Sequence, residues 1–136
     1  MGQLPQLQNP KTILVVDDDP DVLNLVSVAL EDDYHILRAN SGREAVEKSN
    51  DSQSEIHLLL SDFQMPGMTG VELAIKITAQ RPTIKVLLMS GFTGGMLVLN
   101  EGWHFLPKPF IPSQLRALIA GLVSPDKPSK FAAGPR

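Results

Sequence analysis

The chain has 136 residues, of which 43% are hydrophobic and 20% are charged, and its net charge is −3. This length fits one globular domain and leaves no room for a second independent core. The chain has no cysteine, which excludes disulfides, thiolate metal sites and cysteine nucleophiles. The slightly acidic balance also argues against a broad basic face that binds nucleic acid.

Apolar runs in this chain are short. Ile13–Val16 and Met96–Leu99 span four residues each, far fewer than the ~20 that cross a bilayer. No basic segment followed by an apolar signal core is present at the start of the sequence. We therefore expect a cytoplasmic domain that neither inserts into a membrane nor binds nucleic acid directly.

The two ends differ in composition from the middle. Residues 1–10 contain two prolines and three glutamines, and residues 124–136 contain three prolines with scattered basic residues. Neither segment has enough apolar side chains to form a core, so we expect flexible ends or linkers there. The folded domain is expected over residues 11–123.

Short apolar runs bounded by turn-forming residues recur along this domain. Such runs, without strict alternation, are typical of strands covered on both faces in a parallel sheet. The runs are Ile13–Val16, His35–Leu37, His57–Leu60, Lys85–Met89 and His104–Leu106.

Helix-start signals separate these runs. Asp19–Pro20 combines an N-cap acceptor with a proline in the first helical position, and Ser41–Glu44 and Thr69–Glu72 both spell a capping box. Apolar residues at helical spacing predict the buried stripes. These stripes are Val22, Leu25, Val26 and Ala29; Val71, Ala74, Ile75 and Thr78; and Leu115, Leu118, Ile119 and Leu122.

The alternation of strands and helices predicts an α/β fold of the (βα)5 type. Right-handed crossovers then give a doubly wound, parallel, five-stranded sheet, usually in the flavodoxin-like order 2-1-3-4-5. Ligands of such sheets bind at the carboxyl ends of the strands that flank the point where the order reverses.

Polar side chains stand at these strand ends. They are Asp17, Asp18 and Asp19 after the first strand, Asp62 after the third, Ser90 after the fourth and Lys108 after the fifth. Two carboxylates about 5 Å apart repel by roughly 3 kcal/mol at an effective dielectric constant of about 20, so clustered acids take up protons or a cation. An all-oxygen site favours Mg²⁺. Lys108 and Ser90 would then suit a phosphoryl group, with an Asp carboxylate as its acceptor.

Four segments resemble the receiver domain of two-component response regulators. They occur in the family's order, each at a predicted strand end, and the resemblance covers Thr12–Val123. The segments are Ile13–Pro20, Leu60–Gly70, Leu88–Gly91 and Leu106–Phe110.

This resemblance implies a role for each matching residue. Asp62 would be the phosphoacceptor, and Mg²⁺ would be held by Asp17, Asp18, Asp62 and the backbone carbonyl of Gln64. Lys108 would bind the phosphoryl group. The phosphoryl donor would be a histidine kinase or a phosphotransfer domain.

The resemblance also implies how the signal is passed on. Ser90 would be the switch hydroxyl and Phe105 the switch aromatic residue, with a cis Lys108–Pro109 bond next to the lysine. A bond made only in the phosphorylated state shifts a population between two conformations. Such a domain catalyses only its own phosphorylation and dephosphorylation. We therefore expect no turnover of an external substrate and no enzyme activity in the usual sense.

One segment departs from the family pattern. Ser90 and Lys108 are closer in sequence than usual by about one helical turn, and residues 94–102 begin with two glycines. We therefore expect a short or irregular fourth helix, a remodelled apolar patch of Trp103 with Met96–Leu99, and no dimer through the family's usual face.

Two other functions compete with this interpretation. A haloacid-dehalogenase-type phosphohydrolase would use Asp17 as nucleophile, but it needs an acidic pair after the lysine, and Asp126 is the only acid beyond Lys108. A pseudo-receiver would keep the fold without the chemistry, but such domains usually lose an acid or the lysine. The three histidines, His35, His57 and His104, show no metal-binding spacing and predict a packing role.

Overall fold

The computed structural model describes residues 10–91 and 102–123. Strands and helices alternate in these ranges: β1 (Thr12–Val16), α1 (Pro20–Leu30), β2 (His35–Ala39), α2 (Gly42–Asp51), β3 (Leu58–Asp62), α3 (Gly70–Gln80), β4 (Lys85–Ser90), β5 (Trp103–Pro107) and α4 (Pro112–Val123). The sheet has the order β2-β1-β3-β4-β5, and every strand pair is parallel. The predicted fold class and strand order are confirmed.

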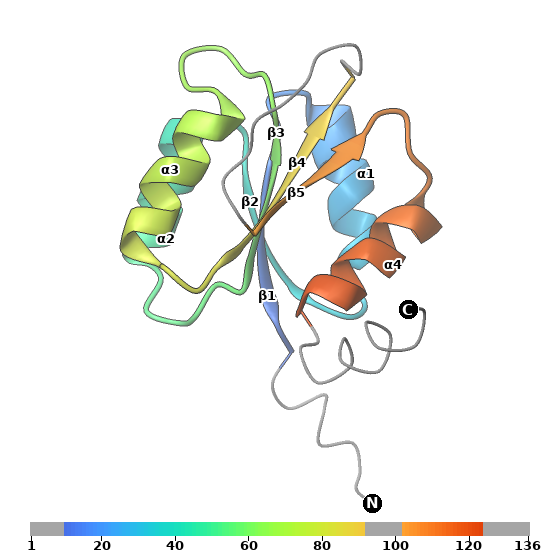
Figure 1. Cartoon of the computed structure of the whole chain (residues 1–136), viewed down its shortest axis with the longest axis horizontal. Helices are drawn as coiled ribbons and strands as arrows, with labels where there is room; N and C mark the ends of the chain where they lie inside the picture. The colour runs from blue at the N-terminus through green and yellow to red at the C-terminus, as the bar shows by residue number, and fades with distance from the viewer. Residues whose placement is uncertain (1–9, 92–101, 124–136) are drawn as a thin grey trace, which may run out of the picture.

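The sheet lies between two helical layers (Figure 1). Helices α1 and α4 cover one face, and α2 and α3 cover the other. Because successive residues of a strand point to opposite faces, Ile13 and Val15 of β1 join the core under α1 and α4. Leu14 and Val16 join the core under α2 and α3.

Burial differs between the central and the edge strands. All residues of β1 and β3 are buried, as expected for strands covered on both faces. The edge strands β2 and β5 are less buried, but residues of both pack against the cores on the two faces of the sheet, so the predicted cover on both faces is confirmed. An edge strand has one neighbour in the sheet, and its outer side stays open to solvent.

The two predicted capping boxes differ in the structure. At the start of α3, Thr69 Oγ1 accepts from the backbone N–H of Glu72 at 3.1 Å, and Glu72 Oε1 accepts from the N–H of Thr69 at 2.9 Å. At the start of α2, Ser41 accepts from the N–H of Glu44, but Glu44 accepts from the N–H of Asn40 instead. The second box is therefore half formed.

The buried faces of two helices are rotated from their predicted positions. Leu25 and Ile75 were expected in the core but are 51% and 52% exposed. Apolar residues stand on several sides of α1 and α3, so their spacing alone leaves the rotation of each helix about its axis open. Val26 and Ala74 are buried as predicted, and the two helices also bury Leu30, Leu73 and Ile77, which the predicted stripes did not include. In α4, Leu115 and Ile119 are buried as predicted.

Some predictions fall on residues that the structure does not describe. The short helix expected between β4 and β5 and the Met96–Leu99 part of the apolar patch lie outside the described residues. Positions 1–9 and 124–136 of the expected flexible ends also lie outside them. Trp103 lies in β5 and packs, half-buried, against the core under α2 and α3. None of the helices in the described ranges has the length and apolar character needed to span a membrane.

Candidate functional site

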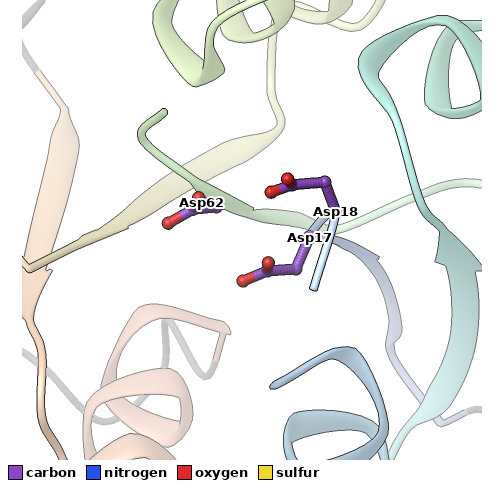
Figure 2. Close-up of side chains that lie close together, drawn as sticks. All are labelled: Asp17, Asp18 and Asp62. Atoms are coloured by element: carbon purple, nitrogen blue, oxygen red, sulfur yellow. The ribbon is translucent and has the colours of Figure 1, made fainter. Parts of the chain in front are cut away.

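Three carboxylates gather at the carboxyl edge of the sheet (Figure 2). Asp17 and Asp18 directly follow β1, and Asp62 ends β3, which is the neighbour of β1 in the sheet. One oxygen atom from each of these side chains lies within 4.8 Å of the other two. The parallel pairing of β1 and β3 thus brings together acids that are more than 40 residues apart in the sequence.

Asp17 is the most buried of the three acids, with 1% of its surface exposed. Its Oδ1 accepts from the backbone N–H of Asp19 at 2.9 Å. Its Oδ2 is buried and has no hydrogen-bond partner among the residues that the structure describes. Burial, and then the negative charge of Asp62, raise the pKa of Asp17 above its ordinary value, against the opposing hydrogen bond from Asp19.

Lys108 supplies the positive charge at this edge. Its Nζ lies 2.9 Å from Asp62 Oδ1 and 3.6 Å from Asp17 Oδ2. Burial acts to lower the pKa of Lys108, but the hydrogen bond to Asp62 and the charges of Asp17 and Asp62 outweigh it, so the pKa is raised. The Lys108–Pro109 bond is cis, as the resemblance implied.

The main chain joins Lys108 to the end of β4. The backbone N–H of Lys108 donates to the carbonyl of Ser90 at 2.7 Å. Ser90 is the last residue of β4 and is buried, with 3% of its surface exposed. The predicted phosphoryl-binding lysine and the predicted switch hydroxyl are therefore held next to each other by the backbone.

The other two predicted residues are Gln64 and Phe105. Gln64 is exposed in the segment between β3 and α3, two residues after Asp62. Phe105 lies in β5 opposite Leu88 and packs, half-buried, against the core under α2 and α3. Phe105 thus occupies a face of the sheet rather than the acidic edge.

The donor set suits a hard divalent cation. It consists of oxygen atoms only, and one of them, Asp17 Oδ2, is buried without a hydrogen-bond partner in the described part of the chain. Lys108 Nζ lies 3.6 Å from this oxygen, beyond hydrogen-bond distance, and a buried carboxylate oxygen without a hydrogen bond is unfavourable unless a closer cation or a proton compensates it. The acidic pocket therefore fits a metal ion such as Mg²⁺, whose ligands are oxygen atoms.

A mostly apolar hollow lies beside the acids, and sequence reasoning missed it. It has a volume of ≈ 480 Å³ and is lined by Val22, Leu25, Gly91, Lys108, Pro109 and Phe110. The signal in the sequence was the surplus of apolar residues on α1, which exceeds what one buried stripe needs. The exposed side chain of Leu25 belongs to this hollow rather than to the core.

Known proteins resemble this chain in sequence and in structure. The response regulator receiver protein CpdR of Brucella abortus is 36% identical over 83 residues, which cover 60% of this chain and 68% of that protein. The sensor kinase CckA of the same organism is 30% identical over 83% of this chain and 12% of its own length. The crystal structure of the receiver domain from the hybrid histidine kinase CckA matches with a TM-score of 0.74 and 30% identity, covering 82% of this chain and 98% of that domain.

Many relatives are longer than this chain. It spans between 13% and 57% of the length of five further curated proteins that it matches, several of which are named as transcriptional regulators. The family model of the response regulator receiver domain matches residues 13–120. With its parallel sheet and its cluster of acids at the expected strand ends, the chain belongs to the family of response regulator receiver domains of two-component systems.

Proposed function

We propose that this receiver domain accepts a phosphoryl group on Asp62 with the help of Mg²⁺ and then changes conformation to pass the signal on. One observation carries the proposal. The Asp62 carboxylate lies 2.9 Å from the ammonium group of Lys108 and within a cluster of three acids. The proposed nucleophile is thus close both to a cation that suits a phosphoryl group and to oxygen atoms that suit a metal.

The transfer is a displacement at phosphorus. A carboxylate oxygen of Asp62 forms a bond to the phosphorus atom, while the bond from phosphorus to the donor's imidazole nitrogen breaks and its electron pair leaves with the imidazole. With acetyl phosphate as donor, the P–O bond breaks and acetate leaves. When bound, Mg²⁺ compensates negative charge on the phosphoryl oxygens.

Two residues of this chain then stabilise the product. Lys108 holds Asp62 before transfer, and its ammonium group is close enough to pair with a phosphoryl oxygen afterwards. The side chain of Ser90 stands at the end of the strand next to Asp62. A hydrogen bond from its hydroxyl to the phosphoryl group, made only in the phosphorylated state, would shift the conformational equilibrium by about 1–3 kcal/mol. Phe105 is our candidate for the residue that repacks in response.

The proposed donor is a histidine kinase or a phosphotransfer domain. Support comes from the sensor kinase CckA, part of which resembles this chain. Support also comes from the hollow beside Lys108, which Leu25 and Phe110 line. An exposed apolar surface next to the acceptor can form an interface with a donor protein. We propose that the domain is labelled once per molecule and does not turn over an external phosphoester.

Intact-mass spectrometry after incubation with acetyl phosphate and Mg²⁺ tests this proposal. We expect one phosphoryl group on the wild type and none on Asp62→Asn. Asp51→Asn, which changes an exposed acid at the end of α2, is the matched control and should be labelled like the wild type. Labelling of Asp62→Asn, or continuous hydrolysis of a generic phosphoester such as p-nitrophenyl phosphate, would contradict the proposal.

A further inference from the structure

Gly70 touches the main chain of the acceptor residue. It is buried and is the first residue of α3. A Cβ atom built on Gly70 would lie 2.3 Å from the carbonyl oxygen of Asp62, 3.0 Å from Cα of Phe63 and 3.1 Å from the carbonyl carbon of Asp62. Real Cβ atoms essentially never come closer than 3.0 Å to such neighbours. Any side chain at position 70 therefore has to displace backbone.

The backbone that Gly70 touches is fixed by other contacts. Phe63 donates its N–H to the carbonyl of Met89 at 2.6 Å and accepts from the N–H of Gly70 at 2.9 Å. The carbonyl of Asp62 accepts from Ser61 Oγ at 2.9 Å, and this hydroxyl is completely buried. The start of α3 is itself held by its complete capping box. A displacement at position 70 therefore passes to Asp62 rather than relaxing elsewhere.

Other glycines of the described residues do not have this effect. A Cβ on Gly42 would lie 2.7 Å from the sulfur, 2.9 Å from Cβ and 3.0 Å from Cγ of Met68, so it would displace Met68 rather than the main chain of the acceptor residue. A Cβ on Gly121 would have nothing within 4 Å. Among the glycines whose surroundings are described, Gly70 is the one whose added Cβ would meet main-chain atoms.

We propose that Gly70 and Ser61 are positioning residues for the phosphoacceptor. Gly70 lets the start of α3 sit against the carbonyl of Asp62, and Ser61 holds that carbonyl from the neighbouring position. Together they aim the Asp62 carboxylate at Lys108 and at the other two acids. This inference rests on the proposed function, because it assigns these residues a part in phosphorylation at Asp62.

The test compares Gly70→Ala with Gly42→Ala, which adds the same methyl group on the same side of the sheet. The rate of Asp62 labelling by acetyl phosphate and the affinity for Mg²⁺ alone are measured beside thermal unfolding. We expect Gly70→Ala to label more slowly by on the order of tenfold to a hundredfold, because small displacements of reacting groups have effects of this size, and to bind Mg²⁺ more weakly. Gly42→Ala should keep both properties even where it lowers the melting temperature.

Amide spectra of the metal-free protein separate positioning from general loss of stability. In Gly70→Ala the N–H signals of Asp62 and Phe63 should shift, whereas in Gly42→Ala the shifts should centre on Met68. Equal labelling rates for Gly70→Ala and the wild type would overturn the proposal. So would losses in both variants that simply follow their losses of stability.

Ser61→Ala keeps the test decisive if Gly70→Ala does not fold. It removes only the hydroxyl that bonds the Asp62 carbonyl, and it should slow labelling several-fold and shift the Asp62 amide signal. Unchanged labelling and an unchanged spectrum would overturn the proposal. If the wild type itself is not labelled at Asp62, the proposed function fails, while Mg²⁺ affinity and the amide shifts still decide whether Gly70 and Ser61 position Asp62.

Discussion

The two ends of the sheet differ in how well their charged groups are satisfied by hydrogen bonds. At the amino end, Arg81 donates to Ser49 Oγ at 2.9 Å and to the carbonyls of Ser49, Ser52 and Ser54 at 2.8, 3.0 and 3.1 Å. At the carboxyl end, Lys108 pairs with Asp17 and Asp62, Asp18 lies near these two acids, and a buried oxygen of Asp17 has no hydrogen-bond partner in the described ranges.

The amino end also satisfies the start of β1. The backbone N–H of Thr12 donates to His57 Nδ1 at 3.0 Å, while the N–H of His57 donates to the carbonyl of Thr12 at 2.8 Å. The imidazole thus replaces a further strand residue as acceptor, which agrees with the packing role predicted for this histidine. The difference between the ends indicates that the contacts that stabilise the fold and the proposed phosphorylation chemistry lie at opposite ends of the sheet, so substitutions should affect one without the other.

Removal of the cation at the carboxyl end should have the largest effect. Lys108→Met keeps the length of the side chain but loses the charge 2.9 Å from Asp62. We expect labelling by acetyl phosphate to slow by roughly 10²–10³-fold, as for the loss of one preorganised donor to developing charge. Lys76→Met, on α3 and away from this edge, is the control. A rate for Lys108→Met within about twofold of that control would show that Lys108 has no part in transfer.

Removal of the Arg81 side chain at the amino end should lower the stability of the fold instead. Arg81→Ala breaks four hydrogen bonds that join α3 to the end of α2 and the segment before β3. We expect the free energy of unfolding to fall by roughly 2–4 kcal/mol, measured by urea denaturation, with the labelling rate unchanged.

Arg43→Ala is the control for Arg81→Ala. The side chain of Arg43 is 88% exposed and lies 3.9 Å from Glu47, and such surface pairs contribute little. A loss of labelling in folded Arg81→Ala at a temperature well below its unfolding transition would contradict the separation of the two edges.

Removal of the charge of Asp17, whose buried Oδ2 has no hydrogen-bond partner in the described residues, should stabilise the metal-free domain. Asp17→Asn keeps the shape of the side chain and removes a buried charge, so we expect a gain of about 1–2 kcal/mol at neutral pH in the absence of metal. The stabilisation of the wild type by Mg²⁺ should disappear in this variant. A loss of stability in metal-free Asp17→Asn would mean that the charge of Asp17 is favourable in the fold.

The sign of the pH dependence follows from the pKa of Asp17. This pKa is raised in the folded state above the ordinary value of 3.8, so the folded state binds the proton more tightly than the unfolded state. The stability that the protonated Asp17 side chain contributes is fully present below pH 3.8 and is lost as the pH rises through the folded-state pKa. The advantage of Asp17→Asn should therefore grow with pH across this window in chelator-treated protein, and a constant difference would contradict the assignment.

A small effect, confined to stability, is expected for His57→Phe. It keeps an aromatic ring but removes the acceptor of the Thr12 N–H, so we expect a loss of about 1–2 kcal/mol in unfolding free energy. Labelling of Asp62 should be unchanged, because His57 lies at the opposite end of β3. A change in the labelling rate would show that the two ends are coupled.

Much of the fold and of the site could be predicted because the signals are local or follow from topology. The apolar runs predicted all five strands, and Thr69 with Glu72 predicted the start of α3 from four consecutive residues. Asp17 and Asp62 could be placed together because the carboxyl ends of neighbouring parallel strands share an edge.

Other features depend on contacts that spacing does not encode. The rotation of α1, which leaves Leu25 exposed, is decided by packing on the sheet among many apolar candidates. Arg81 reaches Ser49, 32 residues away, and no local pattern marks it. No spacing in the sequence shows that Gly70 contacts the carbonyl of Asp62, and this contact is seen only in three dimensions.

The most direct test locates the phosphoryl group and its metal dependence together. Wild-type protein is treated with acetyl phosphate, with Mg²⁺ or with excess chelator, and the acyl phosphate is trapped by borohydride and mapped by peptide mass spectrometry. We predict modification at Asp62 alone, and only in the presence of Mg²⁺. Modification at another acid, or at Asp62 to the same extent in chelator, would contradict the account of this edge as a metal-assisted phosphoacceptor site.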